Sequence, residues 1–281
     1  MPASPPVLDA DWLGACRRAT AELSAMLAAA PTTRERAVEV GQGEGGDTTL
    51  VIDRDAEVAV FDQLDALHAA GAAFTAVSEE RGEVAYGGGD VSVIIDPIDG
   101  SLNAKRGLPH HALSIAVADG PTMADVVFGY VYDFGPGEEW IAHRGEGAFL
   151  DGVRIDPTLE ERRSRAGKLE VLALESADPR WIAQAVEPLE RRAHRVRALG
   201  SIAVSMCQLA ATRVDAFATI KRCRAIDVAA AQLIAREGGA HVAFTGCDDP
   251  LGAPLDLEPR APVVAARTPE ALEELAALPA T

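Results

Sequence analysis

The chain has 281 residues, of which 48% are hydrophobic and 25% charged, proportions that are ordinary for a folded globular protein and exclude a disordered one. Its formal net charge of -17 argues against a nucleic-acid-binding surface, which would require a basic patch. No apolar run approaches the roughly 18 residues that a membrane span needs, and no signal peptide precedes the four scattered cysteines, so we expect reduced thiols in a cytoplasmic protein.

The first part of the chain predicts two helices with a loop between them. Apolar residues at helical spacing indicate a helix over residues 9–30, which Pro31 closes. Residues 37–47 are too rich in glycine to pack, so we expect a mobile loop or a loose hairpin of the kind that often lies over a site. The second helix spans residues 53–70. Asp53 lies at or near its start, where a helix N-cap is an interpretation that needs no catalytic role.

A buried strand over residues 91–95 delivers negative charge to its end. It is nearly all apolar and β-branched, and Asp96 and Asp99 follow it directly. Pro97 stops the strand, so both aspartates can face one point. Two close carboxylates beside an apolar strand repel each other unless a cation lies between them, and a hard divalent ion, Mg²⁺ or Mn²⁺, meets that need.

Gly100 and Ser101 come next and are placed to open a helix whose free N–H groups point at an anion. A metal pair and a phosphate cradle would then lie within six residues of each other. The alternative is that residues 96–101 form an ordinary turn, because Pro, Asp and Gly all favour turns for local reasons.

A second strand, over residues 74–78, also ends in acidic residues, Glu79 and Glu80. These side chains are therefore further candidates for the same edge of a sheet. The alternative is a surface turn in which Arg81 pairs with one of the two glutamates.

Downstream, apolar runs separated by turn signals predict an antiparallel meander. The predicted strands cover residues 113–118, 126–132, 139–142 and 148–150. A polar, arginine-rich stretch over residues 156–167 is the candidate boundary between an N-terminal α+β half, residues 1–160, and a C-terminal α/β half, residues 161–281. The two halves would form one continuous catalytic unit.

Beyond this boundary strands and helices alternate, which favours an α/β arrangement. The predicted strands cover residues 169–174, a segment near 196, 215–219 and 262–266, and the predicted helices cover 179–192, 201–211, 227–237 and 269–278. Asp227 lies at the N-terminus of the helix over residues 227–237, and Gly238 and Gly239 end that helix.

Three separated segments now line up. They are Ser-Glu-Glu-Arg-Gly at 78–82, Asp-Pro-Ile-Asp-Gly-Ser at 96–101, and Ile-Asp-Val-Ala-Ala-Ala at 226–231 with Glu-Gly-Gly at 237–239 behind it. In this order and separation they resemble the motifs of the inositol monophosphatase family, the Mg²⁺-dependent, lithium-sensitive phosphatases of a wider sugar-phosphatase superfamily. The glycine-rich loop before Asp47 most resembles the branch of dual inositol monophosphatase and fructose-1,6-bisphosphatase enzymes.

The resemblance implies the α+β class and the layered αβαβα sandwich of this family. It implies that the N-terminal half carries most metal ligands and that the C-terminal half closes over the substrate. It also implies a homodimer, two or three Mg²⁺ ions per site, inhibition by Li⁺, and a small phosphorylated polyol or sugar as the substrate.

The metal ligands implied by the resemblance fall on matching positions of this chain. Glu79, Asp96 and the backbone carbonyl of Ile98 would hold the first Mg²⁺. Asp96, Asp99 and Asp227 would hold the second. Glu79 would also reach a weaker third ion and so belongs to the implied catalytic residues.

The remaining implied roles concern water, phosphate and substrate. Asp53 and Ser101 would position a metal-bound water and take its proton for in-line attack on phosphorus. The amides of Gly100 and Ser101 would bind the phosphate oxygens. Gly200 and Ser201 would contact the substrate.

Substrate choice is indicated by the segment before Asp227. Ile220 stands seven residues before this aspartate, where animal inositol monophosphatases place a glutamate that contacts inositol hydroxyls, which argues against strict inositol specificity. Lys221, Arg222 and Arg224 follow, and we expect Lys221 or Arg224 to bind a second substrate phosphate. The alternative is that these cations are solvated or pair with the abundant carboxylates.

We therefore predict a Mg²⁺-dependent phosphomonoesterase that hydrolyses myo-inositol-1-phosphate, fructose-1,6-bisphosphate or both by means of a metal-activated water. A nucleotide phosphatase acting on 3′-phosphoadenosine 5′-phosphate and a catalytically silent regulatory relative are the alternatives. A silent relative would usually have lost one of the four ligand carboxylates, and all four are present.

Overall fold

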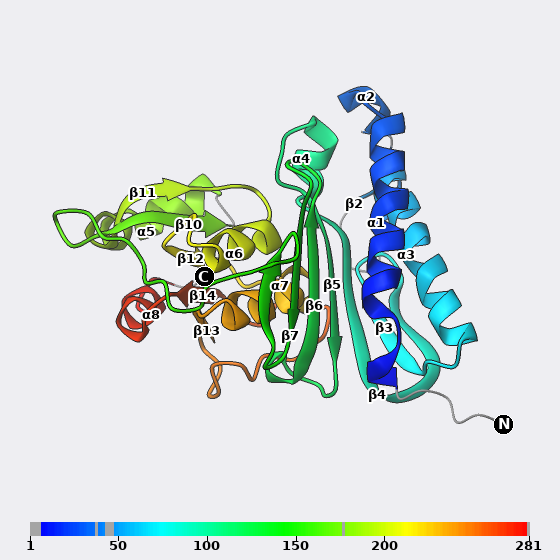
Figure 1. Cartoon of the computed structure of the whole chain (residues 1–281). Helices are drawn as coiled ribbons and strands as arrows, with labels where there is room; N and C mark the ends of the chain where they lie inside the picture. Colours follow the sequence, from blue (N-terminus) through cyan, green and yellow to red (C-terminus); the bar gives the residue numbers. More distant parts are fainter. Residues whose placement is uncertain (1–6, 37–38, 43–47, 176–177, 280–281) are drawn as a thin grey trace.

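Five layers of helices and sheets alternate in the computed structural model, which describes residues 7–36, 39–42, 48–175 and 178–279 (Figure 1). Helices α1 (Trp12–Ala29) and α3 (Val51–Ala69) cover one face of a seven-stranded sheet. The middle layer is α6 (Ile202–Ala210) and α7 (Ala225–Glu237). A five-stranded sheet follows, and α5 (Pro179–Arg192) and α8 (Pro269–Ala276) cover its outer face. The predicted α+β class and αβαβα layering are confirmed.

The larger sheet has the strand order β3-β4-β5-β6-β7-β8-β9. Its strands are β3 (Phe74–Ser78), β4 (Gly82–Asp99), β5 (Ala112–Ala118), β6 (Val126–Asp133), β7 (Glu138–His143), β8 (Gly147–Leu150) and β9 (Val153–Arg154). From β4 onward every neighbouring pair is antiparallel, so the predicted meander is confirmed.

Strand β4 borders β3 twice because the chain doubles back at the glycines of residues 87–89. Phe74 lies opposite Tyr86 and Ser78 opposite Gly82 in the first part of β4. In the second part the register runs the other way, and Ser78 lies opposite Ile95. As a result the end of β3 and the acidic end of β4 meet at one edge of the sheet.

The smaller sheet has the order β11-β10-β12-β14-β13 and is mixed. Its strands are β10 (Leu169–Glu175), β11 (Ala193–Arg197), β12 (Ala216–Thr219), β13 (His241–Phe244) and β14 (Val263–Ala266). β10 is parallel to β11 and β12, whereas β14 is antiparallel to β12 and β13. The sequence pattern missed β13. The predicted boundary over residues 156–167 falls in the connection between the two sheets, and the division into halves stays a prediction.

Small side chains let α7 lie directly against the larger sheet. Ala229, Ala230 and Ala231 are buried, and a Cβ atom at Gly129 of β6 would lie 2.7 Å from the carbonyl oxygen of Ala230. This close approach brings the first turn of α7, with Asp227, to the larger sheet.

The glycine-rich segment is only partly described. Strands β1 (Glu39–Gln42) and β2 (Thr48–Leu50) pair antiparallel, which agrees with the expected loose hairpin, while residues 37–38 and 43–47 lie outside the described residues. The short helices η1 (Val7–Asp9), α2 (Thr33–Arg36) and η2 (Met123–Asp125) were not predicted. In the part of the chain that the structure describes, none of the helices has the length and apolarity required to span a membrane.

Candidate active site

The acidic strand ends converge as predicted at the edge where β3 and β4 meet. Asp96 and Asp99 are buried, with exposed fractions of 6% and 7%. Burial raises the pKa of Asp96 well above its ordinary value, and nearby carboxylates raise it further, in the order Asp99, Asp227 and Glu79. Burial also raises the pKa of Asp99 to about 7. Four carboxylates from three separate segments therefore repel one another at this point.

The segment between the two aspartates is an irregular part of β4, in which the register shifts between Asp96, opposite Ser114, and Asp99, opposite Ala112. The backbone N–H of Ile98 donates to Oδ1 of Asp96 at 3.0 Å, and the Ser101 hydroxyl donates to the Ile98 carbonyl at 3.0 Å. Helix α4 (Ser101–Arg106) then begins after Gly100, whose φ of 86° is left-handed. The strand therefore does not stop at Pro97, as predicted, but continues as a bulge to Asp99, and the chain turns only at Gly100.

Two glycines from different halves of the chain touch beside this turn. A Cβ atom at Gly100 would lie 2.9 Å from the carbonyl oxygen of Gly200, and one at Gly200 would lie 2.8 Å from Nδ2 of Asn103. Nδ2 of Asn103 in turn donates to the Leu199 carbonyl at 2.6 Å. Glycine is therefore required at both positions, where two segments 100 residues apart in the chain meet.

Ser201, which we expected to contact the substrate, forms a hydrogen bond with a carboxylate of the site. It donates to Oδ2 of Asp99 at 2.5 Å, and the backbone N–H of Ala203 donates to the same oxygen at 2.7 Å. Ser201 is also the N-cap of α6, where its Oγ accepts from the Val204 N–H. The start of α6 therefore fixes one oxygen of Asp99.

Glu175, at the end of β10, holds this start in place and was missed by sequence reasoning. Its carboxylate accepts the backbone N–H groups of Leu199 and Gly200 at 2.8 and 3.0 Å, and the Ser205 hydroxyl at 2.6 Å. Burial raises its pKa. The signal that could have found it is the one that found Glu79, because a buried strand again ends in an acid.

Arg224 contacts two of the four carboxylates. Its guanidinium donates to Oε1 and Oε2 of Glu79 at 2.7 and 3.2 Å, and to Oδ1 of Asp227 at 3.3 Å. Its backbone N–H donates to Oδ2 of Asp227 at 3.0 Å. For this residue the alternative of pairing with carboxylates is realised, while Lys221 and Arg222 are exposed.

Asp53 lies two residues inside α3, which begins at Val51, so its interpretation as the N-cap is wrong. One turn further on, the buried Glu57 accepts a short hydrogen bond from the Ser78 hydroxyl at the end of β3. The same carboxylate lies 3.5 Å from Arg81, for which the alternative of a surface turn had Glu79 or Glu80 as the partner. Glu57, which sequence reasoning missed, therefore ties the helix that carries Asp53 to the strand that precedes Glu79.

The donor chemistry of the four carboxylates fits a hard divalent cation, because Mg²⁺ takes oxygen ligands and would relieve their mutual repulsion. In the structure as it stands, however, these carboxylates are not arranged as a complete set of metal ligands. Among the described residues, no three His, Cys, Asp or Glu side chains are grouped so that they could hold a metal ion as they stand. Two of the four carboxylates, Glu79 and Asp227, contact Arg224 instead.

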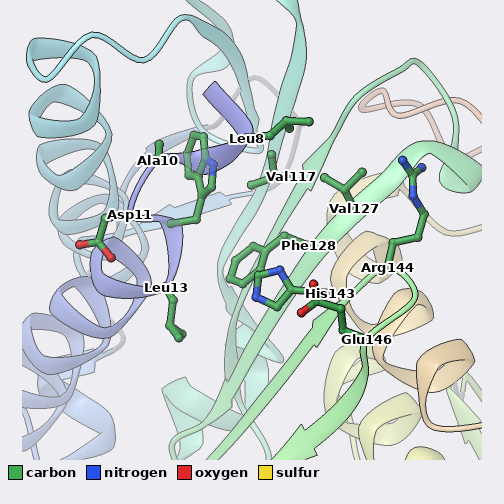
Figure 2. A pocket seen from close by; sticks show the side chains of 11 residues that line it. Leu8, Ala10, Asp11, Leu13, Val117, Val127, Phe128, His143, Arg144 and Glu146 are labelled. Carbon is green, nitrogen blue, oxygen red and sulfur yellow. The ribbon is translucent and has the colours of Figure 1, made fainter. Parts of the chain in front are cut away.

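A separate cavity of 330 Å³ lies at the start of α1 (Figure 2). Its lining includes Leu13, Val117, Phe128 and His143 (Figure 2). Val117 lies opposite Val93 in the sheet, whereas Asp99 lies opposite Ala112. The five steps from Ala112 to Val117 correspond to roughly 17 Å of strand, so this cavity is at the far end of the sheet from the carboxylates.

Comparison with known proteins gives concordant results. A model of the inositol monophosphatase family matches residues 11–279. The chain is 32% identical over 259 residues to a fructose-1,6-bisphosphatase/inositol-1-monophosphatase of Archaeoglobus fulgidus, covering 91% of this chain and 93% of the relative. It is 35% identical over 219 residues to the Nus factor SuhB of Escherichia coli K12, covering 75% and 77%. A crystal structure of an inositol monophosphatase-fructose 1,6 bisphosphatase superposes with a TM-score of 0.79 at 25% identity, covering 94% of this chain and 98% of that one.

Proposed function

Since the chain belongs to the inositol monophosphatase family and is a phosphoric monoester hydrolase, we propose that it hydrolyses phosphate esters of small polyols or sugars with Mg²⁺ as its cofactor. The observation that carries the proposal is the convergence of four carboxylates: Glu79, which directly follows β3, Asp96 and Asp99 of β4, and Asp227 of α7. Mg²⁺ bound among these carboxylates would supply an acidified water and neutralise the phosphate charge.

The chain's own residues would provide the rest of the chemistry. Asp53 and Ser101 would orient the water and accept its proton, as the resemblance implies. The backbone N–H groups of Gly100 and Ser101 would hold the phosphate oxygens. Ser201 would keep one oxygen of Asp99 fixed through its hydroxyl, leaving the other oxygen for the metal.

For the substrate we propose fructose-1,6-bisphosphate, myo-inositol-1-phosphate or both. Relatives named for both activities match most of the chain. Ile220 is buried and apolar at the position where a glutamate would contact inositol hydroxyls, which favours the sugar bisphosphate. We also propose a homodimer, and a reducing compartment such as the cytoplasm, which the four free cysteines support.

The test is a turnover screen of the purified chain over a panel of phosphate esters with Mg²⁺, with Mn²⁺ and with EDTA. The panel contains fructose-1,6-bisphosphate, myo-inositol-1-phosphate and 3′-phosphoadenosine 5′-phosphate. We expect metal-dependent release of phosphate from one or both of the first two, with inhibition by Li⁺. If phosphate is released only from 3′-phosphoadenosine 5′-phosphate, the protein is instead a nucleotide phosphatase.

A regulatory role is the second candidate, because relatives at 35% identity are named Nus factor SuhB. The retention of all four carboxylates favours catalysis, and the net charge of -17 disfavours direct contact with nucleic acid. Absence of turnover on every ester of the panel, in a folded protein that binds divalent metal, would favour the regulatory role.

Lys221 is the residue we propose for a second substrate phosphate, because it is exposed and directly precedes the segment that carries Asp227. Lys221→Ala is expected to raise the KM for fructose-1,6-bisphosphate about tenfold, the scale of one lost hydrogen bond to a charged group, and to change the KM for myo-inositol-1-phosphate little. Steady-state kinetics with both substrates checks this. Arg222→Ala is the control, since it removes the same charge from the neighbouring exposed position; equal effects of the two variants would argue against a specific phosphate contact.

A further inference from the structure

Arg224 links two segments that come from opposite halves of the chain. It is the N-cap of α7 and contacts Asp227 three residues ahead, and its guanidinium reaches Glu79 directly after β3. The side chain is 20% exposed, and the two carboxylates are 18% and 14% exposed. Burial alone would lower the pKa of this guanidinium, but the charges of Asp227 and Glu79 outweigh that effect and raise it. The contact is therefore a partly buried, forked ion pair, unlike a loose surface one.

The oxygens that the guanidinium contacts are the ones proposed to bind metal. Both carboxylate oxygens of Glu79 accept hydrogen bonds from Arg224, and so does Oδ1 of Asp227. A magnesium ion needs its oxygen ligands at about 2.0–2.1 Å. An ion at that distance from these oxygens would be close to the guanidinium, and the two positive charges would repel each other.

We propose that Arg224 is an internal competitor of the divalent metal, so that metal binding requires its guanidinium to leave Glu79 and Asp227. This inference rests on the proposed function, because it takes these two carboxylates to be metal ligands. The guanidinium neutralises part of their charge, and the long arginine side chain can turn away without moving the backbone of α7. The residue thus sets the metal concentration at which the site fills.

The test uses Mn²⁺ as the probe and the full-length chain stripped with EDTA. Free Mn²⁺ is measured by electron paramagnetic resonance during titration, which reports binding without any reliance on turnover. Arg224→Gln is expected to bind Mn²⁺ about tenfold more tightly than the parent protein, because one competing charge contact is gone. In EDTA the same variant should melt at a lower temperature than the parent, because its carboxylates repel one another without compensation.

Arg222→Gln is the matched control. It removes one positive charge from an exposed position two residues away, and it should leave both the Mn²⁺ affinity and the melting temperature close to those of the parent. Arg224→Lys keeps the charge without the fork and should bind Mn²⁺ with an intermediate affinity. If Arg224→Gln does not fold, the comparison of Arg224→Lys with the parent decides the question, and no gain in affinity would count against competition.

Two outcomes separate this inference from the proposed function. If the parent protein binds Mn²⁺ and Arg224→Gln binds it no more tightly than Arg222→Gln does, the proposed competition is wrong but the metal site remains. Failure of the parent and of Arg224→Gln to bind Mn²⁺ at millimolar concentration overturns the metal site itself, and the competition with it.

Discussion

Asp96→Asn is expected to lower turnover of the best phosphate ester about a thousandfold or more while the protein stays folded, because a lost metal ligand removes several kcal/mol of transition-state stabilisation. Asp96 is the carboxylate proposed to be shared by both metal ions, so its loss should weaken both. Asparagine has nearly the same shape, and its side-chain oxygen can still accept the Ile98 N–H.

The stability of the same variant should change in the opposite direction. Burial and repulsion from neighbouring carboxylates raise the pKa of Asp96, so its ionised form lowers the free energy of unfolding at neutral pH. Removing this charge should therefore leave the melting temperature in EDTA equal to or above that of the parent. Kinetics and thermal melts on one preparation test both parts.

Asp90→Asn is the control for this experiment, because Asp90 is an exposed aspartate on the turn within β4. It should leave turnover and melting temperature unchanged. An Asp96→Asn variant that turns over at the parent rate would remove Asp96 from the metal site. A variant that loses both activity and a large part of its stability would show that Asp96 is mainly structural.

The positions of the main-chain elements could be predicted from the sequence because they depend on local patterns. The run over residues 91–95 is apolar and β-branched, and it forms the buried second part of β4. The acids at the ends of β3 and β4 could be placed at one edge because each comes at the end of an apolar strand pattern. Short elements with little pattern of their own, such as β13, depend on pairing with a distant strand and were missed.

The partners of the polar side chains could not be predicted, because they depend on contacts between segments far apart in the chain. The strand pattern could have singled out Glu175, but not its partners, because the N–H groups of Leu199 and Gly200 that donate to it lie 24 and 25 residues further along the chain. For Arg224 the sequence left a substrate phosphate and a carboxylate as alternative partners, because it shows the distance from Asp227 but not the position of Glu79, 145 residues earlier. Charge balance among buried groups decides such choices, and it is a property of the assembled site.

Asp53 is the remaining residue whose role the fold constrains. Glu57 contacts Ser78 at the end of β3, and Asp53 lies four residues earlier on the same face of α3. A helix rises about 1.5 Å per residue, so Asp53 is about 6 Å further toward the start of α3 than Glu57. We propose that Asp53 acts beside the metal ligands, as the resemblance implies.

Asp53→Asn is accordingly expected to lower kcat by about 10² to 10⁴ with little change in KM, because a positioned general base acts in the transition state and contributes little to substrate binding. The competing expectation comes from its place in the first turn of α3, where loss of a negative charge costs only about 0.3–1 kcal/mol of stability through the helix dipole. Asp55→Asn removes an equivalent charge two residues later in the same helix, where the side chain pairs with Arg54, and serves as the control. If Asp53→Asn keeps its kcat and loses a little melting temperature, as Asp55→Asn does, Asp53 only stabilises the helix. If Asp53→Asn alone loses most of its kcat, Asp53 acts on the attacking water.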